Sequence, residues 1–193
     1  MVQSTGYNKI RTAVFISGTG SNLKSLIKFS KTHKSPISID FIFSNDSKAK
    51  GLNYAKRYKI KKKVLNFKNK YLSENNLLSI LKINNIEMIC LAGFMKILSK
   101  NFVKSFKGKI LNIHPSLLPK YKGLNTHERV LRNNEKYSGC TVHFVNSRLD
   151  SGKIILQKKI KISKNETGAS LAKKILFQEH KLYPKAILKV FNL

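Results

Sequence analysis

The chain has 193 residues, 41% of them hydrophobic, which is enough to bury the core of one domain and short for two. No stretch approaches the 18 apolar residues of a membrane span, and the start MVQSTGYNKI has no apolar signal segment, so we expect a cytoplasmic protein without a membrane partner. The net charge of +29 invites a nucleic-acid interpretation, but only five of the 38 basic residues are Arg and the lysines are spread throughout, which favours a solvated surface over a specific nucleic-acid site.

Short apolar runs typical of buried strands alternate with helical patterns along most of the chain. Strictly alternating β and α elements predict an α/β fold with a mostly parallel central sheet and helices on both faces. Ser21 and Ser73 are the expected helix N-caps. The predicted strands are 11–17, 37–43, 62–67, 86–92, 109–114, 139–145 and 153–162, and the predicted helices are 22–30, 48–58, 73–85, 99–106 and a closing helical region at 166–191, after an N-terminal tail at 1–10.

The two cysteines, Cys90 and Cys140, lie far apart in the sequence without a CxxC spacing. This pattern predicts reduced thiols and argues against both a disulfide framework and a cysteine zinc site.

The first strand ends in SGTGSN (17–22), which opens a helix. Gly18 and Gly20 allow tight turns, so the amides of residues 20–22 can point at an anion at the helix N-terminus. The third glycine of a dinucleotide fingerprint is absent, because position 23 is Leu. The motif therefore favours a single phosphate, with a tight turn that binds nothing as the alternative.

Two further strand ends carry unusual stretches. LAGFMKILS (91–99) is either the wall of an apolar slot for a flat heterocycle or simple packing of the next helix. In NIHPSLLP (112–119), Asn112 and His114 alternate along a strand, so their side chains project to the same side. An amide beside an imidazole suits stabilisation of an oxyanion, although a histidine at a strand end is often structural.

Asp150 lies in the turn RLDSG (148–152), where its carboxylate can orient or charge a histidine. Cys140, His143 and Asp150 also admit a thiol nucleophile. We favour a supporting role for His143, which alternates with apolar residues on a strand, and expect no covalent intermediate.

Six motifs, GTGSNL, LAGFMKILS, LNIHPSLLPKYKGLNTH, GCTVHFV, LDSGKIILQ and QEHKLYP, resemble in order and spacing the glycinamide ribonucleotide formyltransferases of purine synthesis. The resemblance implies a three-layer Rossmann-like formyltransferase fold over one domain, 1–193, with a phosphate-binding half at about 11–105 and a folate and catalytic half at about 106–193. It also implies formyl transfer from 10-formyltetrahydrofolate to the glycine amine of 5-phosphoribosylglycinamide, without a metal.

The resemblance assigns roles residue by residue. Asn112, His114 and Asp150 are the implied catalytic residues, with His143 and Ser116 in support. The implied ribonucleotide contacts are Gly20, Ser21, Asn22 and Glu179; the implied folate contacts are Met95, Lys96, Ile97, Leu98, Asn112, Asn146, Leu149, Asp150 and, weakly, Lys68. The chain departs from the family pattern at Lys96, where Arg is usual, and at Asn125, where His is frequent, which bears on folate binding more than on the chemistry.

Three alternatives remain at this point: a methionyl-tRNA formyltransferase-like enzyme, a formyltetrahydrofolate deformylase-like enzyme, and a basic nucleic-acid-binding module. The first two relatives carry an additional domain, for which we expect no room in 193 residues. We expect small-molecule substrates, no specific nucleic-acid partner, and a monomer or homodimer.

Overall fold

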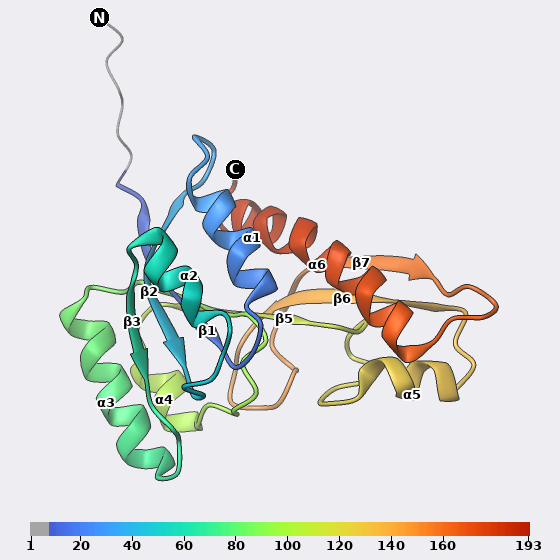
Figure 1. Ribbon diagram of the computed structural model, residues 1–193, viewed down its shortest axis with the longest axis horizontal. Helices are drawn as coiled ribbons and strands as arrows, with labels where there is room; N and C mark the ends of the chain where they lie inside the picture. The colour runs from blue at the N-terminus through green and yellow to red at the C-terminus, as the bar shows by residue number, and fades with distance from the viewer. Residues whose placement is uncertain (1–7) are drawn as a thin grey trace, which may run out of the picture.

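The computed structural model describes residues 8–193, and its strands form one seven-stranded sheet in the order β3-β2-β1-β4-β5-β6-β7 (Figure 1). The first five strands in this order pair in parallel, and β6 and β7 are antiparallel. All seven predicted strands are confirmed. They are β1 (Ile10–Ile16), β2 (Ile37–Ser44), β3 (Lys61–Val64), β4 (Met88–Leu91), β5 (Lys109–His114), β6 (Tyr137–Phe144) and β7 (Ile154–Lys161).

The predicted tail is only partly open to comparison, because residues 1–7 lie outside the described part of the chain and β1 already begins at Ile10. The predicted helices are present, and the closing region is one long helix. The helices are α1 (Ser21–Ser30), α2 (Leu52–Tyr58), α3 (Lys70–Ile83), α4 (Lys100–Ser105), α5 (Thr126–Arg132) and α6 (Gly168–Val190).

Both predicted N-caps are wrong. Ser21 is the first residue of α1, whose N-cap is Gly20, and Ser73 lies inside α3. Helix α3 starts earlier than predicted because the side chain of Asn69 accepts a hydrogen bond from the backbone N–H of Leu72. Helix α5 is an element that the sequence analysis did not predict.

Two hydrophobic clusters cover opposite faces of the sheet, which confirms the expected three layers. Along β1, Val14 and Ile16 face the cluster that contains α1, α2 and α6, whereas Ala13 and Phe15 face the cluster that contains α3 and α4. This alternation follows from the two-residue period of a strand, and because both faces are covered, β1 is apolar almost throughout.

Helix α6 contains Pro184, which has no backbone N–H to donate to the carbonyl of His180 one turn earlier. The hydroxyl of Ser25 in α1 donates to that carbonyl over 2.8 Å. The two helices lie side by side on the same face of the sheet (Figure 1), so the hydrogen bond that proline removes is replaced by one that joins α1 to α6.

The carboxyl ends of β1, β4 and β5 are neighbours in the sheet. The chain runs outward from β1 to β2 and β3 on one side, and returns through β4 and β5 on the other. Such a reversal of strand order leaves a crevice beyond the strand ends, which is where α/β proteins bind ligands.

Candidate active site

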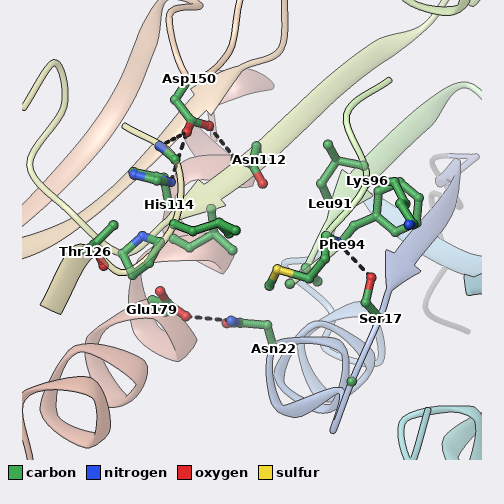
Figure 2. A pocket seen from close by; sticks show the side chains of 18 of the residues that line it. Ser17, Asn22, Leu91, Phe94, Lys96, Asn112, His114, Thr126, Asp150 and Glu179 are labelled. Atoms are coloured by element: carbon green, nitrogen blue, oxygen red, sulfur yellow. Dashed lines mark hydrogen bonds and ion pairs between the residues drawn. The ribbon is translucent and has the colours of Figure 1, made fainter. Parts of the chain in front are cut away.

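A cavity of about 860 Å³ lies at these strand ends and is lined from six segments, 17–22, 91–98, 112–115, 123–128, 143–150 and 172–179. Figure 2 shows Asn112, His114 and Asp150 on one side of the cavity, with Asn22 and Glu179 below and Lys96 across from them. The cavity lining includes every predicted site residue except Lys68 and Ser116. Lys68 is exposed outside the lining, so the structure does not bring it to the site.

The predicted phosphate turn has the backbone that the sequence suggests. Gly20 has a φ of +73°, a conformation that favours glycine, and a Cβ there would lie 2.7 Å from the Cα of Gly51. No side chain caps α1, and its first turn carries no acidic residue. The N-terminus of α1 therefore meets the cavity without a carboxylate from its own first turn.

Asn22 and Glu179 form a buried pair on the floor of the cavity (Figure 2). The Asn22 amide donates to the Glu179 carboxylate over 2.7 Å, and each residue is 6% exposed. Burial raises the pKa of Glu179 to about 7, against the opposing effect of the Asn22 hydrogen bond. The side-chain oxygen of Asn22 is buried and has no hydrogen-bond partner among residues 8–193.

The loop after β4 presents an apolar surface to the cavity. Met95 and Ile97 are each 62% exposed, although both are large and hydrophobic, whereas Leu98 is buried against Phe102 and belongs to the core. The position of Leu98 limits its predicted ligand contact to the backbone. An exposed apolar wall beside a cavity is the arrangement expected of a slot for a flat ring.

Ser17 joins this loop to the phosphate turn. Its backbone N–H donates to the carbonyl of Gly93, and its hydroxyl accepts from the backbone N–H of Met95 over 2.7 Å and donates to Asn45 (Figure 2). The sequence analysis did not identify Ser17, because a serine before a glycine-rich turn carries no pattern of its own.

The three predicted catalytic residues converge on one carboxylate. Asp150, with its side chain 8% exposed, places one oxygen 3.4 Å from Nδ1 of His114 and the other 3.5 Å from the Asn112 amide nitrogen. The other ring nitrogen of His114, Nε2, lies 2.9 Å from the carbonyl oxygen of Tyr121. Each ring nitrogen of His114 therefore faces an oxygen acceptor, a carboxylate on one side and a backbone carbonyl on the other.

His143 lies beside Asn112. Its Nδ1 lies 2.8 Å from the carbonyl oxygen of Phe144, which can only accept, so Nδ1 carries the proton and Nε2 accepts from the Asn112 amide over 3.2 Å. Burial lowers the pKa of His143, with the Phe144 carbonyl and Asp150 opposing. A neutral His143 therefore orients the amide of Asn112 toward Asp150.

The loop between β5 and α5 contributes backbone groups that sequence reasoning missed. The N–H of Gly123 donates to Asp150 over 2.9 Å, and the carbonyl of Tyr121 accepts from His114. Ser116, buried completely, donates to the carbonyls of Lys120 and Tyr121 and so holds the start of this loop. Backbone contacts leave no signature in side-chain chemistry, and the only signal available was the low charge of GLNTH.

The cysteines are free and buried, which confirms the predicted reduced thiols. Burial raises the pKa of the Cys140 thiol to about 12. Because the thiolate is the nucleophile, a thiol of this kind is inert at neutral pH, and the alternative of a Cys140 nucleophile loses its support.

Within residues 8–193, no helix is long and apolar enough to cross a membrane. The same residues contain no group of three or more His, Cys, Asp or Glu side chains arranged to hold a metal ion.

The chain is similar in sequence and in structure to known proteins. A formyl transferase family model matches residues 10–187. The chain is 39% identical to the phosphoribosylglycinamide formyltransferase of Escherichia coli over 177 residues, 90% of this chain and 84% of that protein. A crystal structure of the phosphoribosylglycinamide formyltransferase from Brucella melitensis superposes with a TM-score of 0.89 at 40% identity, covering 95% of this chain and 96% of that one.

Longer proteins contain the same unit. The human trifunctional purine biosynthetic protein adenosine-3 is 43% identical over 182 residues, which are 93% of this chain but 18% of that protein. The chain thus spans less than a fifth of the length of such trifunctional relatives.

Proposed function

The chain belongs to the formyl transferase family, and we propose that it is a phosphoribosylglycinamide formyltransferase. It transfers the formyl group of 10-formyltetrahydrofolate to the glycine amine of 5-phosphoribosylglycinamide and yields formylglycinamide ribonucleotide and tetrahydrofolate. The observation that carries this proposal is the single cavity in which an uncapped helix N-terminus, an apolar wall and the Asn112–His114–Asp150 cluster face one another.

The ribonucleotide occupies the side of the cavity formed by α1 and α6. Its phosphate accepts hydrogen bonds from the backbone N–H groups of Gly20, Ser21 and Asn22, where the helix dipole favours an anion. A ribose hydroxyl contacts Glu179, which lines the cavity and is held in place by the Asn22 amide. This arrangement directs the glycine amine toward β5.

The folate occupies the opposite side. Its pterin ring lies against the exposed Met95 and Ile97, with backbone contacts from residues 95–98 and further contacts from Asn146 and Leu149 in the loop after β6. Lys96 is exposed, so replacement of the family's usual Arg leaves the backbone of the slot unchanged. Each substrate uses segments before and after residue 105, and the two proposed halves of a single catalytic domain therefore share both sites.

The chemistry proceeds at Asn112 and His114. The neutral glycine amine attacks the formyl carbon, and the electron pair of the carbonyl moves to its oxygen, where the Asn112 amide and Nδ1–H of His114 donate hydrogen bonds. Nδ1 lies 3.4 Å from Asp150 and is not held by a short hydrogen bond, whereas Nε2 stays on the Tyr121 carbonyl. The Asn112 nitrogen makes only a long 3.5 Å contact with Asp150, so this donor can turn toward the incoming oxygen. As the tetrahedral species collapses, the bond from carbon to N10 breaks, and the proton lost by the amine reaches N10 with the help of Asp150.

The decisive experiment incubates the purified chain with 10-formyltetrahydrofolate and three acceptors in parallel: glycinamide ribonucleotide, methionyl-tRNA and water alone. We expect release of tetrahydrofolate that depends on the ribonucleotide and yields one formylglycinamide ribonucleotide for each folate consumed. Asp150→Asn serves as the matched inactive variant. Release of formate with water alone would identify a formyltetrahydrofolate deformylase. Formylation of the tRNA would identify a methionyl-tRNA formyltransferase.

A further inference from the structure

The loop of residues 121–125 holds an unfavourable backbone conformation beside the catalytic cluster. Tyr121, Gly123 and Asn125 have φ values of +56°, +76° and +54°. A positive φ is tolerated by glycine and asparagine but disfavours Tyr121, so the conformation at Tyr121 persists only where its surroundings fix it. The shape of this loop therefore depends on contacts from outside it.

Those contacts matter because the backbone of this loop touches two of the proposed catalytic residues. The Tyr121 carbonyl accepts from His114, and the Gly123 N–H donates to Asp150. Ser116 fixes the Tyr121 end, since its hydroxyl donates to the carbonyl of Tyr121 over 3.2 Å. The Gly123 end has no such support from β5.

Arg129, a half-buried residue of α5, supplies that support. Its guanidinium donates through Nη1 to the carbonyl of Lys122 over 2.6 Å and to the carbonyl of Leu124 over 3.3 Å. The guanidinium also lies over the ring of Tyr121, 5.4 Å from the ring centroid. One side chain thus contacts the loop on both sides of Gly123.

The Lys122 carbonyl and the Gly123 N–H belong to the same planar peptide group. Arg129 binds the oxygen end of this group and Asp150 binds the hydrogen end. Because the two ends point in opposite directions from one rigid plane, the contact with Arg129 fixes the direction in which the N–H points.

We infer that Arg129 is a positioning residue for the proposed reaction: it holds the 122–123 peptide group so that the Gly123 N–H fixes the carboxylate of Asp150 against His114. Lysine cannot take the same role fully, because its ammonium lacks the planar face with which the guanidinium stacks on Tyr121. The inference rests on the proposed function for its effect on turnover, but the contact itself can be tested without substrates.

The first measurement is amide hydrogen exchange at Gly123 in the wild type, Arg129→Gln, Arg129→Lys and Arg132→Gln. Arg132 is an exposed arginine on the same helix that makes no side-chain hydrogen bond within residues 8–193, so it is the matched control. We expect exchange at Gly123 to accelerate by roughly tenfold in Arg129→Gln and less in Arg129→Lys, since a charged donor is lost or weakened. Arg132→Gln should match the wild type, as should amides in β1 in all variants.

The second measurement is steady-state kinetics. Arg129→Gln should lower kcat by roughly tenfold while the KM for the ribonucleotide stays within twofold, because the phosphate turn is not touched. The melting temperature of Arg129→Gln should equal that of the control variant Arg132→Gln. Wild-type exchange at Gly123 together with wild-type kcat in a folded Arg129→Gln would overturn the inference. If the wild type does not catalyse the reaction at all, the proposed function fails, and the exchange data still decide the role of Arg129.

Discussion

At the scale of single residues, the Asp150 carboxylate is the point on which the site depends. It lies within 4 Å of His114, His143, Asn112 and Gly123 while almost completely buried. Asp150→Asn removes the charge and keeps an oxygen for Gly123, so the fold should persist. We expect kcat to fall roughly 10²- to 10⁴-fold, the usual contribution of a positioned acid–base group, with little change in the KM for the ribonucleotide. Steady-state kinetics and a melting curve measure both.

The double variant, His114→Asn combined with Asp150→Asn, tests whether the two residues act together. His114→Asn should be about as damaging as Asp150→Asn, and the combination far less than multiplicatively worse, because residues that act as one unit are not additive. A near-normal kcat in a folded Asp150→Asn protein would contradict the proposed mechanism but not the family assignment.

Glu179 gives a prediction for stability against pH. Its pKa is raised to about 7 in the folded protein from an ordinary value of 4.5, because burial disfavours its charge. The folded state therefore binds the proton more tightly than the unfolded state, and the stability linked to this group is present below pH 4.5 and is lost as pH rises to about 7. The total change is roughly 3 kcal/mol at most.

Glu179→Gln removes this ionisation and keeps an oxygen for the Asn22 amide. We therefore expect its free energy of unfolding, from urea titrations at pH 5 and pH 8, to fall less with rising pH than that of the wild type. Glu87→Gln, at an exposed carboxylate, is the control. An unchanged pH dependence in Glu179→Gln would show that Glu179 ionises freely in the folded protein.

Which site residues a sequence can reveal depends on how they act. Asn112 and His114 were predictable because alternation along a strand places both side chains on the same face of the sheet. Asp150 was predictable because its motif, LDSGKIILQ, resembles that of the formyltransferase family. Tyr121 and Gly123 act through backbone atoms, which any residue possesses, so no side-chain pattern marks them. Lys68 was an extrapolation from a family tendency, and the fold leaves it outside the cavity.

At the scale of elements, strands were easier to predict than helix ends. The two-sided burial of β4, and of β1 and β2 toward their carboxyl ends, gives continuous apolar runs. In contrast, α5 buries only Thr126 and Val130, too few positions to establish a helical period in the sequence. The start of α3 was missed because its cap is Asn69 in a stretch of polar residues, any of which could cap a helix.

Ser17 connects two elements that hold different substrates in the proposed reaction. Ser17→Ala removes the acceptor for the Met95 N–H and leaves that group beside the cavity without its partner. We expect the KM for 10-formyltetrahydrofolate to rise by severalfold, on the order of the one hydrogen bond lost, with a smaller change in the KM for the ribonucleotide. Ser47→Ala, on an exposed turn, is the control. Equal changes in both KM values would instead indicate a general loosening of the strand ends.

At the scale of the whole molecule, the positive charge has a structural consequence at the two edges of the sheet. The edge strand β3 carries three consecutive lysines, 61–63, and the opposite edge strand β7 carries Lys158, Lys159 and Lys161. Like charges on exposed edges repel the edges of other molecules and so oppose aggregation by strand pairing. Part of the charge is therefore explained without any anionic partner.

The remaining effect of the charge is on encounter. Both proposed substrates are anions, and a net charge of +29 raises the rate at which anions reach the cavity, while salt shortens the range of that attraction to about 10 Å at 0.1 M. We expect kcat/KM for the ribonucleotide to fall on the order of tenfold as NaCl rises from low to high concentration, with kcat nearly constant, because the chemistry takes place in a shielded site. Sucrose at matched osmolality is the control: it should leave kcat unchanged and lower kcat/KM by no more than its effect on viscosity.

Charge reversal separates steering from a direct role. Lys62 and Lys63 are exposed on β3 and do not line the cavity, so Lys62→Glu combined with Lys63→Glu should reduce the salt dependence slightly and leave kcat unchanged. The same variant should bind single-stranded RNA less tightly at low salt, since lysines on a surface hold polyanions mainly through counterion release. A loss of kcat with an unchanged melting temperature would mean that the basic surface takes part in the reaction itself, because steering alone acts before the substrate is bound and cannot alter turnover once the site is saturated.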